Sequence, residues 1–478
     1  MDNFFESAYS IAQQIKDNSI TSKEVVSKYF DNIESKNSEL NAFLITDKQA
    51  AIRQAEIVDQ KIQAGQQVGT LAGLPVAIKD NICTDDFTTT CASKILREWK
   101  PPYNATVIQK LISQDAIILG KTNLDEFAMG SSTEHSAFGP TKNPVDPSRV
   151  PGGSSGGSAC AVKTDMASVA LGSDTGGSIR QPAAFCGIVG MKPTYGLVSR
   201  YGLIAFASSL DQIGPFGKTV KDCALVLNAI SGHDPYDSTS LDIKSDDYLQ
   251  YVDRDLKGIR IGLIEEFDEV LDVSLRENLE SATNLFKQNG AEIVKVSLPY
   301  VKYALSTYYL IAPAEASSNL ARFDGVRYGL RVDGDNVEEM MINTRTQGFG
   351  QEVKRRIMLG TYALSSGYYD AYYKTAQKLR TALISDFKKV YDQVDVIICP
   401  TTPTGAFEFG AKLDDPLQMY MSDIFTIPSN LAGHPAISVP FGTDSNGMPL
   451  GIQILADGLN DSKVIHVGSA LETLRTEG

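Results

Sequence analysis

Two clusters rich in glycine and serine, separated by a short apolar segment, constrain this chain more than any other feature. The first cluster covers residues 151–158, the second covers residues 172–180, and the residues between them are mostly small and apolar. Glycine allows positive φ angles and lets another group approach the backbone closely. A flexible Gly/Ser linker would not carry an apolar segment between its two halves. We therefore interpret the clusters as two loops that build an active site.

Apolar runs alternate with amphipathic stretches along the rest of the chain, which predicts an α/β fold. Runs of strand length lie at residues 74–78, 116–119, 187–190, 259–264, 292–296, 395–400, 436–440 and 450–455. Helical spacing of apolar residues is found at residues 104–114, 219–230, 273–288, 300–320, 354–390 and 464–474. Strands separated by helices pair in parallel and place the helices on the sheet faces. We expect one large domain over residues 1–478, with a mixed central β-sheet covered by helices on both faces.

Two parts of this domain are expected to differ in role. Residues 1–65 read as an N-terminal helical layer, because a capping box begins at Thr21 and apolar residues follow at helical spacing. This layer is expected to pack against the rest of the domain, and a partner-binding role is the alternative. Residues 70–200 are expected to form the catalytic core, because they contain both glycine clusters and a lysine, Lys79, directly after the strand predicted at residues 74–78.

Charge and composition exclude several classes of protein. The formal net charge of −14 argues against this chain alone gripping a nucleic-acid backbone, which needs clustered Lys and Arg. There is no run of eighteen apolar residues that would predict a membrane span, and the N-terminus resembles neither a signal peptide nor a transit peptide, so we expect a cytoplasmic protein. The six cysteines form no Cys-x-x-Cys pair and the four histidines form no His-Glu-x-x-His pattern. No metal site is predicted.

Two familiar motifs match only in part. Gly-Lys-Thr at residues 120–122 resembles the end of a phosphate-binding P-loop, but Asp115 stands where that motif needs a glycine. Residues 152–156 fit the Gly-x-Ser-x-Gly turn of α/β hydrolases, which requires a strand directly before the serine. The preceding residues 143–151 contain three prolines, which are wrong for a central strand. The sequence therefore favours neither a P-loop nor this type of hydrolase.

A serine nucleophile activated by a neutral lysine explains more of the sequence. Lysine must lose its proton to act as a base, and burial favours this by disfavouring the charged form. Lys79 is expected at the carboxyl end of a strand, where ligands bind in α/β sheets, although a solvated lysine at a strand end is the alternative. Ser178 follows Gly176 and Gly177, and backbone N–H groups of such a turn can converge on an oxyanion. We expect Ser178 as the nucleophile and Lys79 as the base, with a second serine relaying the proton if the two do not touch.

Three segments together resemble the signature of the amidase signature family, namely residues 77–80, 152–158 and 176–182. In that family a Ser-cisSer-Lys triad cleaves amide bonds. The resemblance implies that Ser178 forms the acyl-enzyme, that Ser154 is the bridging serine after a cis peptide bond, and that Lys79 is the base. It also implies an oxyanion hole made of the backbone N–H groups of Thr175, Gly176, Gly177 and Ser178.

Four longer runs resemble a branch of this family whose members act in tRNA-dependent amidation; they span residues 122–131, 315–325, 354–357 and 425–433. The resemblance implies that free glutamine is hydrolysed to glutamate and ammonia, and that the ammonia passes to a partner B subunit. That partner is expected to bind the tRNA and to amidate Glu-tRNA(Gln) with ATP and Mg, while Asp-tRNA(Asn) stays open as a second substrate. A small C subunit is expected to clasp the pair. No cofactor is expected in this chain.

The resemblance also implies which residues bind glutamine. The family places the α-carboxylate and α-amine of glutamine against an Arg, an Asp and a Tyr, and the best matches here are Arg356, Asp423 and Tyr308. Bidentate Arg–carboxylate contacts would distinguish free glutamine from a peptide amide. Ser131 is a further candidate contact. The alternatives are that Arg356 lies on a solvated helix face and that Tyr308 belongs to the core.

Two other functions compete with this hypothesis. A stand-alone amidase of the same family would act on small amides through the same triad. A protein from another class would use the glycine-rich loops as an anion-binding nest for phosphate. Tight nucleotide binding without covalent labelling of Ser178 would favour the second of these.

Overall fold

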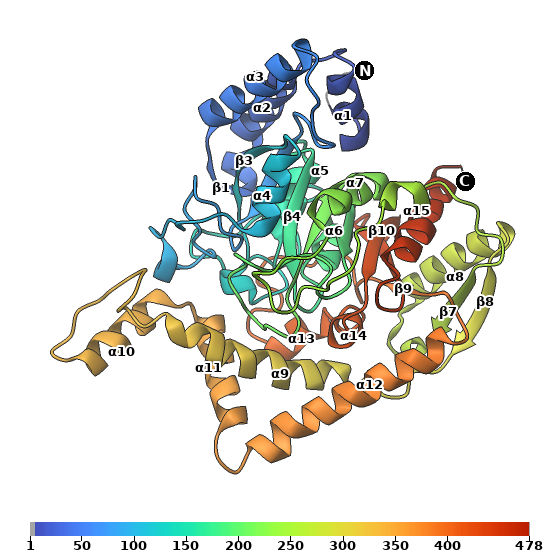
Figure 1. The fold of residues 1–478 in the computed structure, drawn as a ribbon. Helices are drawn as coiled ribbons and strands as arrows, with labels where there is room; N and C mark the ends of the chain where they lie inside the picture. Colours follow the sequence, from blue (N-terminus) through green and yellow to red (C-terminus); the bar gives the residue numbers. More distant parts are fainter. Residues whose placement is uncertain (1–4, 478) are drawn as a thin grey trace.

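One mixed sheet runs through residues 5–477, the part of the chain that the computed structural model describes (Figure 1). The strands in these residues are β1 (Phe43–Thr46), β2 (Pro75–Lys79), β3 (Ile117–Thr122), β4 (Val169–Asp174), β5 (Val189–Lys192), β6 (Gln212–Gly217), β7 (Arg260–Ile264), β8 (Glu292–Val296), β9 (Val396–Pro400), β10 (Ala436–Thr443) and β11 (Pro449–Leu455). Across the sheet their order is β1-β3-β2-β4-β6-β5-β10-β11-β9-β7-β8. β2 is parallel to β3 and β4, and β7 is parallel to β8 and β9, whereas the other neighbours are antiparallel.

Helices surround this sheet, as Figure 1 shows. Those in the described residues are α1 (Ala8–Lys16), α2 (Ser22–Leu40), α3 (Lys48–Gln63), α4 (Thr106–Ser113), α5 (Gly156–Lys163), α6 (Arg180–Cys186), α7 (Val220–Ile230), α8 (Val273–Gln288), α9 (Ala304–Asn319), α10 (Val337–Gly348), α11 (Gln351–Leu364), α12 (Thr375–Tyr391), α13 (Pro416–Met421), α14 (Ile427–Ala432) and α15 (Asp461–Glu477). The mixed sheet with helices around it confirms the α/β fold class predicted from the sequence.

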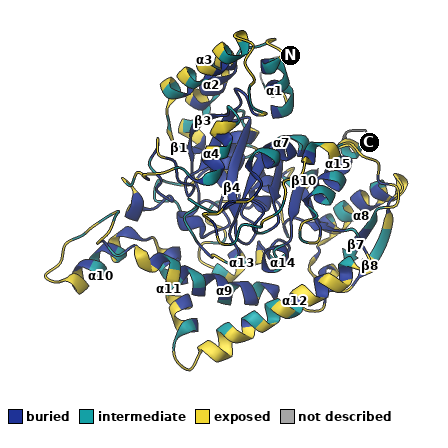
Figure 2. Ribbon diagram, viewed as in Figure 1, coloured by how far each residue is buried: buried dark blue, intermediate teal, exposed yellow. Residues whose placement is uncertain are grey.

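Two large apolar cores lie against the sheet, and Figure 2 shows the strands in the middle of the molecule as buried. The first core contains side chains from α1, α2, α7 and α15. The second contains side chains from α9, α12 and α14. β2, β3 and β4 are buried along their whole length, which is typical of strands covered on both faces.

The N-terminal segment, expected as a helical layer, contains three helices and also one strand within residues 5–65. It contains β1, a short edge strand that pairs antiparallel with β3, with Phe43 opposite Thr122 and Thr46 opposite Gly120. Four residues are too few for a clear alternating pattern, and this strand forms because the edge of β3 offers free backbone groups. The capping box at Thr21 is present, since its hydroxyl accepts from the Glu24 amide and the Glu24 carboxylate accepts from the Thr21 amide.

The single helix predicted over residues 354–390 is also wrong. α11 ends at Leu364, a π-helical turn covers Tyr369–Lys374, and α12 follows. Gly367 lies between them with a φ of 88°, a left-handed conformation that a continuing helix cannot contain. Figure 1 shows α9 to α12 on one side of the molecule, with the turn between α11 and α12 extending away from the sheet.

The parallel strands β2 and β4 bring the catalytic-core segments together. Val76, Ala77 and Ile78 of β2 lie opposite Val169, Ala170 and Leu171 of β4, so the carboxyl ends of both strands meet at the same edge. Lys79 ends β2 and Asp174 ends β4. The sheet topology thus places the lysine beside the second glycine cluster.

Candidate active site

Lys79 is fully buried at the end of β2, so the alternative of a solvated lysine at a strand end is wrong. Its Nζ lies 2.7 Å from the Oγ of Ser154, 3.0 Å from the Oγ of Ser173 and 3.3 Å from the carbonyl oxygen of Ser173. Burial lowers the pKa of Lys79 to about 7, although nearby carboxylates oppose this shift. A large fraction of the amine is therefore neutral near neutral pH and able to accept a proton.

Ser154 follows a cis peptide bond from Gly153, as the family resemblance implies. The Gly153 amide donates to the side-chain oxygen of Gln181 at 2.8 Å, and the Asp125 amide donates to the Ser154 carbonyl oxygen at 3.2 Å. A Cβ on Gly153 would lie 2.1 Å from a carboxylate oxygen of Asp125, so any larger residue here would clash. These contacts fix Ser154 in front of Lys79.

Ser178 lies in the loop between β4 and α6 and is 8% exposed. Its carbonyl oxygen accepts from the Ser155 amide at 3.3 Å, which joins the two glycine-rich loops. Within residues 5–477 its hydroxyl makes no hydrogen bond, and Lys79 does not contact it directly. A proton moving from Ser178 to Lys79 therefore needs an intermediate carrier.

The backbone N–H groups of the second glycine cluster are not all free. The Gly177 amide donates to the Asp174 carboxylate at 2.9 Å. The amides of Thr175, Gly176 and Ser178 donate to no acceptor in the part of the chain that the structure describes. In this arrangement an oxyanion could be bound by these three amides, whereas Gly177 is engaged in holding the loop.

A buried ion pair, which the sequence did not predict, supports this loop. Arg180 and Asp174 are both fully buried, and the guanidinium donates to both carboxylate oxygens, at 3.0 and 3.1 Å. Burial alone would raise the pKa of Asp174, but the adjacent Arg180 outweighs it and lowers the pKa to about 2. Arg180 also donates to the Thr426 carbonyl oxygen at 3.0 Å and the Ser429 hydroxyl at 2.7 Å. The loop is thereby tied to the start of α14.

The four residues predicted to bind glutamine are brought into one buried region beside Ser178. Ser131 donates its hydroxyl to Asp423 at 2.6 Å. The ring of Tyr308 lies directly against Gly176, because a Cβ there would come within 2.8 Å of it. Burial raises the pKa of Asp423 to about 7, and the Ser131 hydrogen bond and the charge of Arg356 oppose that shift. Burial also raises the pKa of Tyr308. The charge of Arg356 opposes this rise, and the charge of Asp423 adds to it.

Arg356 is only 3% exposed, so the alternative of a solvated helix face does not apply to it. Its Nε donates to Glu352 at 2.8 Å, and its guanidinium carbon lies 5.4 Å from the ring centres of both Tyr309 and Tyr420. These two rings stack on each other at 3.8 Å. The terminal nitrogens of Arg356 donate to no group in residues 5–477, which leaves them able to bind a carboxylate.

Three residues beside the predicted site were not predicted from the sequence. Ser173 contacts Lys79, and Asn81 donates to the Ser173 hydroxyl at 2.9 Å. Glu352 holds Arg356 and also accepts from the Tyr420 hydroxyl at 3.3 Å. The spacing of Glu352 and Arg356, four residues apart in a predicted helix, was a usable signal. Nothing local in the sequence pointed to Asn81.

Metal-binding clusters and membrane-spanning helices are both absent from the described residues. Among residues 5–477, no group of three or more His, Cys, Asp or Glu side chains could hold a metal ion. No helix in that range combines the length and the apolar character needed to cross a membrane.

Comparison with known proteins gives matches over nearly the whole of this chain. The family model described as Amidase matches residues 24–465. The chain is 55% identical over 474 residues to the A subunit of glutamyl-tRNA(Gln) amidotransferase from Carboxydothermus hydrogenoformans, covering 99% of this chain and 98% of that protein. It is 57% identical over 451 residues to the protein of the same name from Thermosynechococcus vestitus, covering 94% of each.

Solved structures agree with the sequence comparisons. The crystal structure of the glutamyl-tRNA(Gln) amidotransferase A subunit from Thermotoga maritima superimposes with a TM-score of 0.82 at 43% identity, covering 99% of this chain and 96% of that one. The native peptide amidase from Stenotrophomonas maltophilia superimposes with a TM-score of 0.83 at 27% identity, covering 98% and 97%.

Proposed function

The chain belongs to the amidase family, and from this we propose that it is the glutaminase subunit of a tRNA-dependent amidotransferase. It hydrolyses free glutamine to glutamate and ammonia in the cytoplasm, and a partner uses the ammonia to amidate Glu-tRNA(Gln). The observation that carries this proposal is the match, at 53–57% identity over 94–99% of the chain, to proteins named as the A subunit of glutamyl-tRNA(Gln) amidotransferase.

In the proposed mechanism, Lys79, Ser154 and Ser178 form a proton relay. Neutral Lys79 takes the proton of the Ser154 hydroxyl, 2.7 Å away, while Ser154 takes the proton of Ser178. The Oγ of Ser178 then attacks the side-chain carbonyl carbon of glutamine. When the tetrahedral intermediate collapses, the relay returns the proton to the leaving nitrogen, so that ammonia departs and a glutamyl ester remains on Ser178. Water attacks this ester by the same route and releases glutamate.

The developing negative charge on the carbonyl oxygen needs donors that are already in place. The free amides of Thr175, Gly176 and Ser178 are suited to this role. The Gly177 amide, which belongs to the oxyanion hole implied by the family resemblance, would serve only if it left Asp174. We propose that Gly177 contributes instead by holding the loop in shape.

The buried charges beside Ser178 support a free amino acid as the substrate. The unengaged terminal nitrogens of Arg356 can bind the α-carboxylate in a bidentate manner, and ionised Asp423 can accept from the α-ammonium. Ser131 keeps the Asp423 carboxylate in place, and Tyr308 closes the site beside Gly176. A stand-alone amidase acting on small uncharged amides would gain nothing from a buried Arg and Asp at these positions.

The partners follow from the same proposal. A B subunit would bind the tRNA and, with ATP and Mg, activate its glutamyl group, while a small C subunit would hold the two larger chains together. Asp-tRNA(Asn) is a second acceptor to be tested.

The test is the release of glutamate from glutamine by this chain, alone and with candidate B and C subunits, with and without ATP and Glu-tRNA(Gln). The proposal expects glutamate release to rise when the partners and the charged tRNA are added. High activity on small amides that ignores partners and tRNA would overturn the proposal and identify an independent amidase.

A further inference from the structure

A cavity of about 1070 Å³ lies away from the active site, between residues 94–100 and the junction of α10 with α11. Neither the triad nor the residues proposed to bind glutamine line it. Its charged side chains are four cationic groups and one carboxylate; they are Lys94, Arg97, Lys100, Lys354 and Glu98. A strongly cationic cavity is unexpected in a chain whose net charge is −14.

None of the four cationic groups forms an ion pair within residues 5–477. Lys354 donates to the Thr346 carbonyl oxygen at 3.2 Å, and the Arg97 guanidinium lies 5.3 Å from the centre of the Phe138 ring. Glu126 is buried nearby, but it is hydrogen-bonded to Ser93 and to the Gly350 amide. The positive charge of the cavity is therefore available to an anionic ligand.

Aromatic rings form part of the cavity wall. The rings of Trp99 and Tyr328 lie 5.9 Å apart at an angle of 35°, both half-buried, and Phe349 contributes a buried ring. Planar bases stack on rings of this kind, and cationic side chains beside them bind phosphate. A simple inorganic or aliphatic anion would leave the rings unused.

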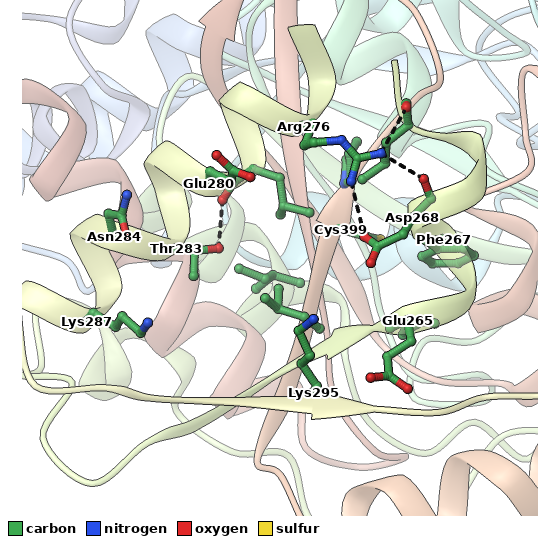
Figure 3. A pocket seen from close by; sticks show the side chains of 16 residues that line it. Glu265, Phe267, Asp268, Arg276, Glu280, Thr283, Asn284, Lys287, Lys295 and Cys399 are labelled. Carbon is green, nitrogen blue, oxygen red and sulfur yellow. Dashed lines mark hydrogen bonds and ion pairs between the residues drawn. The ribbon is translucent and has the colours of Figure 1, made fainter. Parts of the chain in front are cut away.

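A second cavity, shown in Figure 3, provides a contrast. It measures about 390 Å³ and lies between α8 and the ends of β7 and β9. Its charges are mixed, since Lys287 and Lys295 lie in the same cavity as Glu265 and Glu280. Arg276 there is already paired with Asp268. This cavity has no preference for an anion.

We propose that the first cavity binds a nucleoside phosphate, with the base on Trp99 and Tyr328 and the phosphate against Lys94, Lys100 and Lys354. The ligand is a free nucleotide or a nucleotide within a single-stranded RNA, because both present the same base and phosphate. The site stands apart from the glutaminase site, and binding to it can be measured without glutamine or partner subunits.

Trp99 is the only tryptophan of the chain and lines this cavity, so its fluorescence reports on binding here. It also lines a neighbouring cavity of about 350 Å³, which contains none of the three lysines, so the lysine variants described below decide between the two cavities. The purified chain is titrated with AMP, ADP, adenosine, inorganic phosphate and hexaadenylate RNA, and calorimetry gives the affinities independently. Saturable quenching by AMP or ADP identifies a free nucleotide, and quenching by the RNA alone identifies an RNA segment; both support the proposal. Inorganic phosphate binding as tightly as AMP, or no binding by any probe up to millimolar concentration, overturns it.

Charge reversal gives the second arm of the test. The double variant Lys94→Glu/Lys100→Glu should weaken binding by about tenfold or more, since charge-assisted hydrogen bonds to phosphate are lost. The matched control is Lys287→Glu/Lys295→Glu, which changes the net charge equally in the cavity of Figure 3 and should leave binding unchanged. Equal loss of binding in both double variants, or in neither, would contradict the proposed site. Circular dichroism and glutaminase activity check that each variant is folded.

Discussion

The amine nitrogen of Lys79 lies 2.7 Å from the hydroxyl oxygen of Ser154, and both residues are fully buried. Ser178, on the neighbouring loop, is slightly exposed and does not touch Lys79. The arrangement makes Ser154 the group that can connect the proposed base, which is buried, to the proposed nucleophile, which is 8% exposed.

The rate of glutamine hydrolysis should depend on the protonation of Lys79, whose pKa is about 7. Below that pH the amine holds its proton and cannot act as a base, so kcat/KM should fall about tenfold per pH unit, and above it the rate should level off. Asp423 ionises over the same range, because its pKa is also about 7. Rates should therefore be measured from pH 5 to 9 with both glutamine and a simple uncharged amide, since the latter does not need Asp423.

The variant Lys79→Ala tests directly whether Lys79 is the base. It should abolish acyl-enzyme formation while the circular dichroism spectrum stays that of the wild type. A variant that retains near-normal glutaminase activity, or a wild-type profile that is flat across pH 7 with both substrates, would exclude Lys79 as the base.

Ser154→Ala should lower kcat for glutamine by about 10²–10⁴-fold, the usual contribution of a positioned proton-transfer group. Amidation that uses added ammonia in place of glutamine should continue at the wild-type rate, because it bypasses this site. The matched control is Ser155→Ala. The Ser155 hydroxyl donates to the Ser173 carbonyl oxygen at 3.2 Å and does not contact Lys79. Equal losses in the two variants would argue against a relay through Ser154.

Much of this site could be predicted because its residues carry local signals. Lys79 follows an apolar run that does form a strand, and glycines mark the loops that surround it. Ser173 and Asn81 could not be assigned, because the contacts of Ser173 with Lys79 and with Asn81 depend on the pairing of β2 with β4, nearly a hundred residues apart. That pairing is a property of the whole sheet, which no local pattern specifies.

Other differences between prediction and structure have local causes. The Gly177 amide, expected in the oxyanion hole, instead donates to the Asp174 carboxylate at 2.9 Å. Asp174 stands three residues before Gly177, a spacing at which an Asp side chain commonly accepts from backbone amides. Gly367 interrupts the apolar pattern that suggests one long helix, and its φ of 88° is incompatible with continuing α11 into α12. β1 was not predicted, because an edge strand of four residues is stabilised by pairing with its neighbour β3 more than by its own composition.

Arg356→Ala should raise KM for glutamine by about 10–100-fold, the loss expected when a charge-assisted contact to the α-carboxylate is removed. Hydrolysis of a simple uncharged amide should change little, because that substrate has no carboxylate. Arg355→Ala is the matched control on the same helix, since Arg355 also pairs with Glu352 but its side chain is 40% exposed. A rise in KM that is the same for both substrates, or the same in both variants, would contradict a carboxylate-binding role.

The buried ion pair Arg180–Asp174 should contribute to the stability of the fold. Arg180→Met leaves the Asp174 carboxylate buried without its partner, which should lower the free energy of unfolding at pH 7 by about 3–5 kcal/mol. The folded-state pKa of Asp174, about 2, lies below its ordinary value of 3.8, so the stability gained from this carboxylate is present above pH 3.8 and is lost as the pH falls through 2. In the variant Asp174 can accept a proton instead, so the difference from wild type should shrink in acid. Urea denaturation at pH 7 and pH 3 measures both effects, with Arg276→Met as the control.

Arg276 pairs with Asp268 at 3.8 Å, and both side chains are about half exposed. An exposed pair of this kind contributes at most about 1 kcal/mol, because water and salt screen the charges. A loss in Arg180→Met no larger than in Arg276→Met would mean that water or a neighbouring group satisfies Asp174 when Arg180 is removed. The loop carrying Ser178 would then not depend on the ion pair, and its shape would have to come from the contacts of Asp174 with the Gly177 and Ile179 amides.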